Sequence, residues 1–384
     1  MNLADLIYGY QKKVPAKGGN KRYINLDNAA STPPFKAVME LICREAEWYS
    51  SVHRGSGFKS KYSTAQYEAS RQVIADFIGA DLRHDTVIFT KNTTDSINKV
   101  AHYLPNIPGE YVIYSGMEHH SNELPWSQVP HICIGVKENG IDLDQLEQAL
   151  RLESGRVKLL AVTGASNVTG HTPPIHTLAE LAHQAGAKIL VDGAQLIPHR
   201  QINLFPPSDP RHIDFLAFSG HKIYAPFGAG VLIAPRSLFQ KNPPSQVGGG
   251  TIIGIGPEGI IWAEAPDVEE AGSPNILGAM AIAESCRVIQ RIGWDPITRH
   301  ETELLEYALK CLEELPELEI YNREKQNRVG VISFNIRGIP HAIVAQHLAE
   351  RGIGVRSGCF CARGYVQSLL DYLQKKFKSC CTGS

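Results

Sequence analysis

Two stretches decide the fold: KILVDGAQ (188–195) and IDFLAFSGHK (213–222) each run from an apolar segment into polar residues. Their apolar parts are typical of fully buried strands, and a helical pattern over 174–185 precedes the first of them. Pro174 suits the first turn of that helix, and Gly186 ends it. Buried strands that alternate with helices predict an α/β fold whose mostly parallel sheet is covered by helices on both faces.

The same alternation extends outward from about residue 85 to residue 235. A further helix is predicted over 142–152, where Asp142 can cap the first turn and every third or fourth residue is apolar. The other candidate strands are TVIFT (86–90), YVIYS (111–115), HICIGV (131–136) and VKLLAV (157–162).

The C-terminal part of the chain has a different pattern. A long helical stretch spans 276–315, and a strand (330–336), a helix (340–351) and a second strand (353–357) follow it. A chain of 384 residues is also long for a single core. We therefore expect three parts: an N-terminal arm (1–21) that packs with the small domain, a large domain (22–275) and a small α+β domain (276–384).

The composition excludes several classes of protein. A hydrophobic fraction of 43%, a charged fraction of 20% and a net charge of −1 predict no nucleic-acid or membrane partner. No apolar run approaches the ~18 residues of a membrane-spanning helix, and the first residues do not follow the order of a signal peptide. We expect a cytoplasmic protein whose eight cysteines stay reduced. The cysteines form no repeated CxxC pair, so no metal site is predicted.

Asp192, Gln195 and Lys222 lie at or just beyond the carboxyl ends of the two deciding strands, where α/β sheets bind their ligands. A buried acid can pair with a pyridinium N–H, and an amide three residues later can reach a ring hydroxyl. A partly desolvated lysine suits a Schiff base. The alternative for Asp192 is a structural role as the cap of the next helix. Together the three residues indicate a site for pyridoxal phosphate (PLP).

Other strand ends carry the remaining parts of such a site. Thr93 and Thr94 follow strand 86–90 at a helix start, where free N–H groups and hydroxyls can hold a phosphate, although an ordinary threonine N-cap is the alternative. His119 can stack on a ring, although a purely structural histidine at the surface or in the core is the alternative, and Ser219 can add a phosphate contact. The combination at successive strand ends favours PLP more strongly than any member does alone.

The sequence resembles class V aminotransferase-fold enzymes (PLP-dependent transferase fold type I), and within them the group II cysteine desulfurases and selenocysteine lyases. DGAQ (192–195) and SGHK (219–222) are the most specific matches. Other matching stretches are LDNAAST (26–32), VHRGSG (52–57), FTKNTTDSIN (89–98), MEHHSNELPW (117–126), SNVTG (166–170), EAGSPN (270–275) and VRSGCFCA (355–362). The resemblance implies a seven-stranded sheet, PLP as cofactor and an amino acid as substrate.

The resemblance also implies roles for single residues. Lys222 would bind PLP covalently, Asp192 would pair with the pyridine nitrogen, Gln195 with the ring oxygen, and His119 would stack on the ring. Asn167 would lie beside the ring. The implied phosphate ligands are Thr93, Thr94, Ser219 and His221, with Ser273 reaching the partner subunit's phosphate in a homodimer. The implied substrate contacts are Asn28, Ala29 and Arg356.

Cys361 matches the loop cysteine of the desulfurase pattern RSGxxCA, which attacks the substrate sulfur. The additional Cys359 gives GCFC, a feature that also resembles molybdenum-cofactor sulfurases. We predict a cysteine desulfurase that yields L-alanine and a Cys361 persulfide, which a sulfur-acceptor protein could receive. The alternatives are another class V reaction (C–S lyase, epimerase or aminotransferase) and an impaired homologue that acts as a binding partner. Both cysteines would then be ordinary loop residues.

The resemblance further implies an Arg-x-Ser segment after the cysteine loop, whose arginine holds the substrate carboxylate. The stretch ARGYVQSLLDYLQKKFKSCCTGS (362–384) contains no such motif. We therefore expect weak substrate binding unless Arg356 or Arg363 compensates. An extended loop would let the Cys359 and Cys361 side chains project the same way, and positive charge on Arg356, Arg363, Lys222 and His119 would favour a thiolate there.

Overall fold

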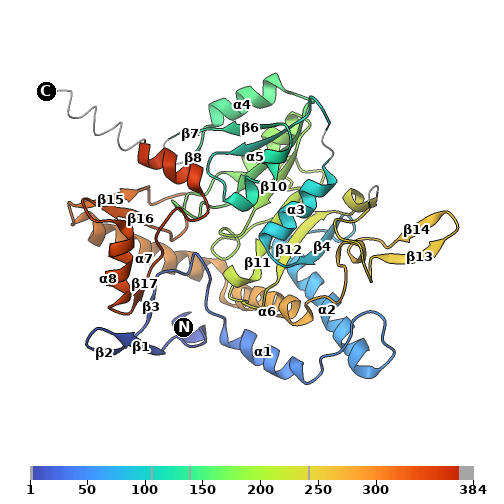
Figure 1. Ribbon diagram of the computed structural model, residues 1–384, viewed down its shortest axis with the longest axis horizontal. Coiled ribbons are helices and arrows are strands. Elements are labelled where there is room, and N and C mark those ends of the chain that lie inside the picture. Colours follow the sequence, from blue (N-terminus) through green and yellow to red (C-terminus); the bar gives the residue numbers. More distant parts are fainter. Residues whose placement is uncertain (1–2, 105–106, 138–139, 241–242, 372–384) are drawn as a thin grey trace.

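A seven-stranded sheet forms the centre of the protein (Figure 1). The computed structural model describes residues 3–104, 107–137, 140–240 and 243–371. The strands follow the order β4 (Asp85–Thr90), β12 (Gly230–Pro235), β11 (Phe215–Ser219), β10 (Lys188–Asp192), β9 (Val157–Thr163), β5 (Tyr111–Ser115) and β6 (His131–Ile134). Only β12 is antiparallel to its neighbours, β11 and β4, while the other paired strands are parallel. The predicted mostly parallel sheet is confirmed.

Helices cover both faces of this sheet, as the buried strands predicted. Successive strand residues point to opposite faces, so Leu160 of β9 belongs to one apolar core and Leu159 to the other. The larger core includes side chains of α1 (Lys36–Ala46), α2 (Phe58–Ile78), α4 (Leu143–Leu152), α5 (Ile175–Gln184) and α6 (Ile276–Ile292). The other core is closed by α3 (Thr93–Tyr103) and by Trp126.

Local signals placed most elements correctly. Asp142 caps α4 by accepting a hydrogen bond from the Gln145 N–H. The predicted strand 131–136 ends at Ile134, because the chain leaves the sheet at Gly135 and β7 (Val136–Lys137) pairs instead with β8 (Gly140–Ile141). The predicted strand 213–218 begins only at Phe215.

The predicted helix 276–315 is in fact two helices, α6 and α7 (Trp294–Glu313). Gly293 separates them in a positive-φ conformation (φ 83°) that a residue with a side chain rarely adopts. The two-stranded sheet of β15 (Leu318–Tyr321) and β16 (Ser333–Ile336) and the helix α8 (His341–Ala349) follow.

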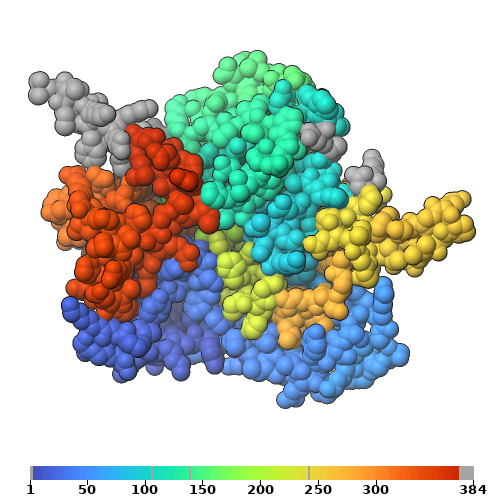
Figure 2. Space-filling model, viewed as in Figure 1, coloured from blue at the N-terminus to red at the C-terminus, as the bar shows by residue number. Residues whose placement is uncertain are grey.

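The N-terminal residues contact the C-terminal part of the chain. β1 (Lys13–Ala16) and β2 (Gly19–Arg22) form a hairpin, and Lys17 N donates to Glu350 O. Next, β3 (Ile24–Asn25) pairs in parallel with β17 (Ile353–Gly354), which is all that forms of the predicted strand 353–357. Figure 2 shows these N-terminal residues (blue) directly against the C-terminal ones (red). The domain boundaries given above stay a prediction.

A second hairpin, β13 (Ile252–Gly256) with β14 (Gly259–Trp262), projects from the body of the molecule (Figures 1 and 2). Short 3-10 turns complete the description: η1 (Leu3–Leu6), η2 (His120–Asn122), η3 (Trp126–Gln128), η4 (Gly220–Lys222), η5 (Arg236–Gln240) and η6 (Asp267–Glu269). Among the described residues, no helix combines the length and the apolar character that crossing a membrane requires.

Candidate active site

A cavity of about 1750 Å³ opens at the carboxyl ends of the parallel strands. It collects nearly all of the predicted site residues in one place. Those that line it are Asn28, Ala29, Thr93, Thr94, His119, Asn167, Asp192, Gln195, Ser219, His221, Lys222 and Arg356. Two predicted residues do not line it: Ser273 is exposed on the loop before α6, and Cys361 lies in a turn beside the cavity.

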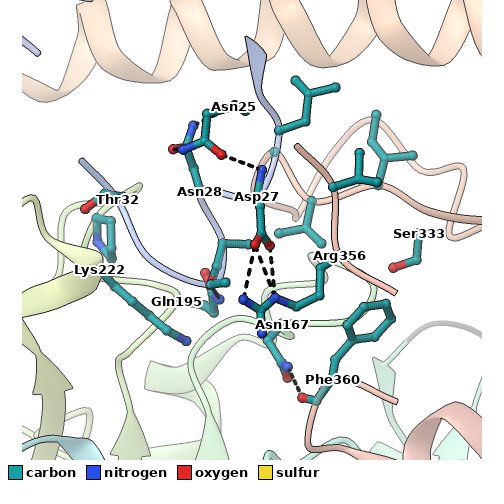
Figure 3. A pocket seen from close by; sticks show the side chains of 18 of the residues that line it. Asn25, Asp27, Asn28, Thr32, Asn167, Gln195, Lys222, Ser333, Arg356 and Phe360 are labelled. Carbon is teal, nitrogen blue, oxygen red and sulfur yellow. Dashed lines mark hydrogen bonds and ion pairs between the residues drawn. The ribbon is translucent and has the colours of Figure 1, made fainter. Parts of the chain in front are cut away.

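Lys222 reaches the cavity from η4, the tight turn that directly follows β11. The turn needs a glycine, because a Cβ on Gly220 would come within 2.8 Å of the Ala225 carbonyl oxygen. Burial lowers the pKa of Lys222, and the nearby Asp192 partly opposes this effect. The Lys222 amino group makes no hydrogen bond to any described residue, and its side chain extends into the space that Gln195 and Arg356 also face (Figure 3).

Asp192 ends β10 as a nearly buried carboxylate that is 5% exposed. Its Oδ1 accepts a hydrogen bond from the Ala194 N–H at 3.0 Å, and its Oδ2 has no partner within the described part of the chain. Burial raises the pKa of Asp192. A carboxylate in this position is therefore stabilised by any cation or charged N–H group that enters the cavity. Gln195 donates to Ala29 O at 2.5 Å, so its amide is already held at the cavity wall.

The start of α3 forms the polar end of the cavity. Its N-cap is Asn92, which accepts from the Asp95 N–H, so the alternative of an ordinary threonine cap is wrong. The Ser219 hydroxyl accepts from Thr93 N at 2.8 Å and shares a 2.6 Å hydrogen bond with the Thr93 hydroxyl. Backbone N–H groups and hydroxyls at a helix N-terminus suit an anion such as phosphate.

His119 faces the cavity as a neutral imidazole. Its Nδ1 accepts from the Ser121 N–H at 3.1 Å, which assigns the ring proton to Nε2. Burial, with a smaller contribution from the positive charge of Lys222, lowers the pKa of His119 to about 4. The expectation that His119 adds positive charge near the cysteine loop is therefore wrong, although a neutral flat ring remains suited to stacking.

Several polar residues of the site were not predicted. Ser121 links two predicted residues, because its hydroxyl lies 2.7 Å from the Thr94 hydroxyl and 3.0 Å from His119 Nδ1. Glu118, the residue before His119, is buried, accepts hydrogen bonds from Asn122 and Thr163 N, and has its pKa raised by burial to about 8. Asp27 holds Arg356. The MEHHSN and LDNAAS motifs contained these residues, but only the folded chain shows their partners.

The cysteine loop is a tight turn and not an extended segment, so the assumption that both thiols project the same way is wrong. Phe360 and Cys361 both have φ of 53°, and Ala362 N donates to Cys359 O at 2.9 Å. Both thiols are exposed, but only Cys359 lines the cavity. A thiolate at Cys361 would raise the pKa of Lys222 and of Arg356, which places it within electrostatic reach of both residues.

Comparisons with known proteins identify the class of protein that this fold and site define. The model of the family "Aminotransferase class-V" matches residues 24–381, and the chain belongs to that family.

Several individual relatives are cysteine desulfurases. A cysteine desulfurase from Cronobacter sakazakii is 38% identical over 356 residues, which cover 88% of this chain and 84% of the relative. A cysteine desulfurase from Shigella flexneri is 37% identical over 353 residues, with the same shares of each chain. Among solved structures, an apo cysteine desulfurase from Thermococcus onnurineus superposes with a TM-score of 0.83 at 35% identity, covering 90% of this chain and 87% of that one. The cysteine desulfurase CsdA from Escherichia coli, in an S-sulfonic acid form, gives 0.79 at 30% identity with the same coverage.

Proposed function

We propose that the protein is a PLP-dependent cysteine desulfurase, which converts L-cysteine to L-alanine and retains the sulfur as a persulfide on Cys361. The observation that carries the proposal is the convergence of Lys222, Asp192 and His119 in one cavity that the cysteine loop borders. Membership of the aminotransferase class-V family and the similarity to cysteine desulfurases support the same reaction.

The residues present fit PLP. Asp192 Oδ2, which has no partner among the described residues, suits a pyridinium N–H. The Lys222 amine suits the aldehyde carbon, and the start of α3 with Thr93 and Thr94 suits the phosphate. Ser219 and His221 would complete the phosphate contacts, with Gln195 and Asn167 at the ring. When bound, PLP supplies an electron sink that stabilises negative charge on the substrate Cα.

The protein's own groups would carry the proton and sulfur transfers. Lys222, whose pKa burial lowers, would take the proton from the substrate Cα and return it later. Asp192 would remain ionised, and its charge would stabilise the protonated pyridine nitrogen on which the electron-withdrawing effect of PLP depends. The Cys361 thiolate would attack the substrate sulfur: an S–S bond forms, the substrate C–S bond breaks, and its electron pair stays with Cβ. A proton then reaches Cβ, which gives alanine.

The substrate contacts, the oligomeric state and the sulfur acceptor belong to the same proposal. Asn28, Ala29 and Arg356 line the same cavity and would contact the amino acid. Ser273, exposed on its loop, would reach the phosphate of a partner subunit in a homodimer. A sulfur-acceptor protein would take the persulfide sulfur, and the location would be the cytoplasm.

The experiment that tests the proposal combines absorbance with product analysis. Purified protein supplied with PLP should show a visible band that borohydride removes, and peptide mass spectrometry should then place the reduced adduct on Lys222. Added L-cysteine should yield alanine and a protein-bound persulfide. The Lys222→Ala variant should lose the fixed adduct and all turnover, whereas Lys91→Ala, at the exposed residue that directly follows β4, should retain both. An adduct on another lysine would refute the site, and sulfide release without any persulfide would indicate a lyase.

A further inference from the structure

The dipeptide His119-His120 divides its two rings between the cavity and the cysteine loop. The His119 ring faces the cavity, while His120 makes two hydrogen bonds to the loop. Its backbone N–H donates to Cys361 O at 2.7 Å, and its Nε2 accepts from the Arg363 N–H at 3.2 Å. His119 is part of the proposed cofactor site, whereas His120 has no role in that site.

The cysteine turn needs support from outside itself. Phe360 and Cys361 are consecutive non-glycine residues in the left-handed region, which costs free energy that neighbouring contacts must offset. The Asn167 side chain donates to Phe360 O at 2.8 Å, and His120 holds the next carbonyl (Figure 3 shows the Asn167 contact). The segments that follow β9 and β5 therefore hold both strained residues through their backbone oxygens.

His120 Nε2 also accepts a hydrogen bond from a backbone N–H in the first turn of a helix. Residues 363–371 are helical, and Val366 N donates to Ala362 O as the first hydrogen bond of that helix. The first N–H groups of a helix have no partner within it, and His120 Nε2 serves the one on Arg363. A small apolar cluster stabilises the start of this helix, because Ala362 and Tyr365 pack against Met117 and Val168.

We propose that His120 is a positioning residue that holds the Cys361 thiol in place for attack on sulfur at the site that His119 borders. The proposal rests on the proposed desulfurase function for the identity of the attacked sulfur, but the docking of the loop on His120 is independent of that function. The short 3-10 turn η2 thus positions both the His119 ring and the Cys361 nucleophile. Loss of the His120 acceptor frees the turn, so Cys361 becomes more accessible to reagents and less competent in sulfur transfer.

The test uses thiol alkylation, which needs no turnover. In a Cys359→Ser background the peptide 357–363 carries one thiol, and iodoacetamide labelling of Cys361 is followed by mass spectrometry. We expect His120→Ala to speed labelling about three- to tenfold, as the loss of one hydrogen bond predicts, and to slow persulfide formation by a similar factor. His120→Gln, which keeps an acceptor at a comparable reach, should restore most of both rates.

A matched pair of variants at Arg363 tests the same hydrogen bond from the donor side. Arg363→Pro deletes the donor N–H at a helix position that favours proline, while Arg363→Ala keeps that N–H and removes the same guanidinium. The difference between these two variants should equal the effect of His120→Ala, and combining His120→Ala with Arg363→Pro should add nothing further. The buried Cys286 is an internal control, because general unfolding would expose it as well.

Three results would overturn the proposal: unchanged Cys361 labelling in both His120→Ala and Arg363→Pro, fully additive effects in the double variant, or parallel labelling of Cys286 in both variants. If the loop behaves as expected but no variant forms a persulfide from L-cysteine, the proposed function fails while the docking by His120 stands.

Discussion

Arg356 is bound to Asp27 across 329 residues of sequence: its Nε lies 3.1 Å from Asp27 Oδ1, and its Nη2 lies 3.1 Å from Oδ2. The pair joins the segment that follows β3 to the residues just before the cysteine loop, and both side chains line the cavity (Figure 3). A carboxylate already occupies the guanidinium that the substrate would use. An amino acid that binds there must share Arg356 with Asp27 or displace it.

Arg356→Ala should therefore raise KM for L-cysteine about tenfold with a smaller change in kcat, because a charged hydrogen bond to the substrate is lost. Steady-state kinetics of alanine production measure the effect. The exposed Arg351→Ala is the control and should leave KM unchanged. A low-micromolar KM that survives replacement of both Arg356 and Arg363 by alanine would contradict this account of substrate binding.

Asp192→Ala should cost far more activity than Gln195→Ala. Asp192 offers a carboxylate that lines the cavity to a full positive charge, while Gln195 offers one neutral hydrogen bond and already donates to Ala29 O. We expect a loss of at least about a hundredfold in kcat/KM for Asp192→Ala and about tenfold or less for Gln195→Ala. Equal losses would argue against pairing of Asp192 with a pyridinium.

Cys361→Ser should abolish persulfide formation and leave the visible band of bound PLP intact, whereas Cys359→Ser should only slow the reaction. The reason is positional: the Cys361 carbonyl is fixed by His120, and a thiolate on Cys361 lies within electrostatic reach of Lys222. Persulfide is measured by mass spectrometry after a single addition of L-cysteine. Normal persulfide formation in Cys361→Ser would assign the nucleophile to Cys359, which lines the cavity, and full alanine production in the double variant would indicate a thiol-independent lyase.

Glu118 should make the protein less stable as the pH rises. Burial raises its pKa from the ordinary 4.5 to about 8. Between these values the folded state binds more protons than the unfolded state, so the free energy of unfolding falls with increasing pH. Glu118→Gln, which mimics the protonated side chain, should remove a decrease on the order of 4 kcal/mol between pH 4.5 and pH 8. Urea unfolding at several pH values measures this, with the exposed Glu147→Gln as control. The same pH dependence in both variants would show that Glu118 does not titrate in this range.

The sequence alone determined the sheet and the edge at which the site lies. Apolar runs such as those of β10 and β11 are long enough to be read as buried strands without any knowledge of their partners. Because parallel strands end at one edge, Asp192 and Lys222 could be placed together from their positions in the chain. Boundaries that depend on pairing were less well predicted: the strand expected at 353–357 has only two paired residues, since β3 is equally short.

Only the tertiary structure decided which partners the polar residues have. Asp27 with Arg356, Asn167 with Phe360, and His120 with Arg363 are each separated by more than a hundred residues, and no local pattern encodes such contacts. The charge of His119 is likewise a property of the fold, because burial and Lys222 together keep it neutral. Strand periodicity is written into short stretches of sequence by the geometry of the backbone, whereas hydrogen-bond partners and protonation depend on what the folded chain brings near and removes from water.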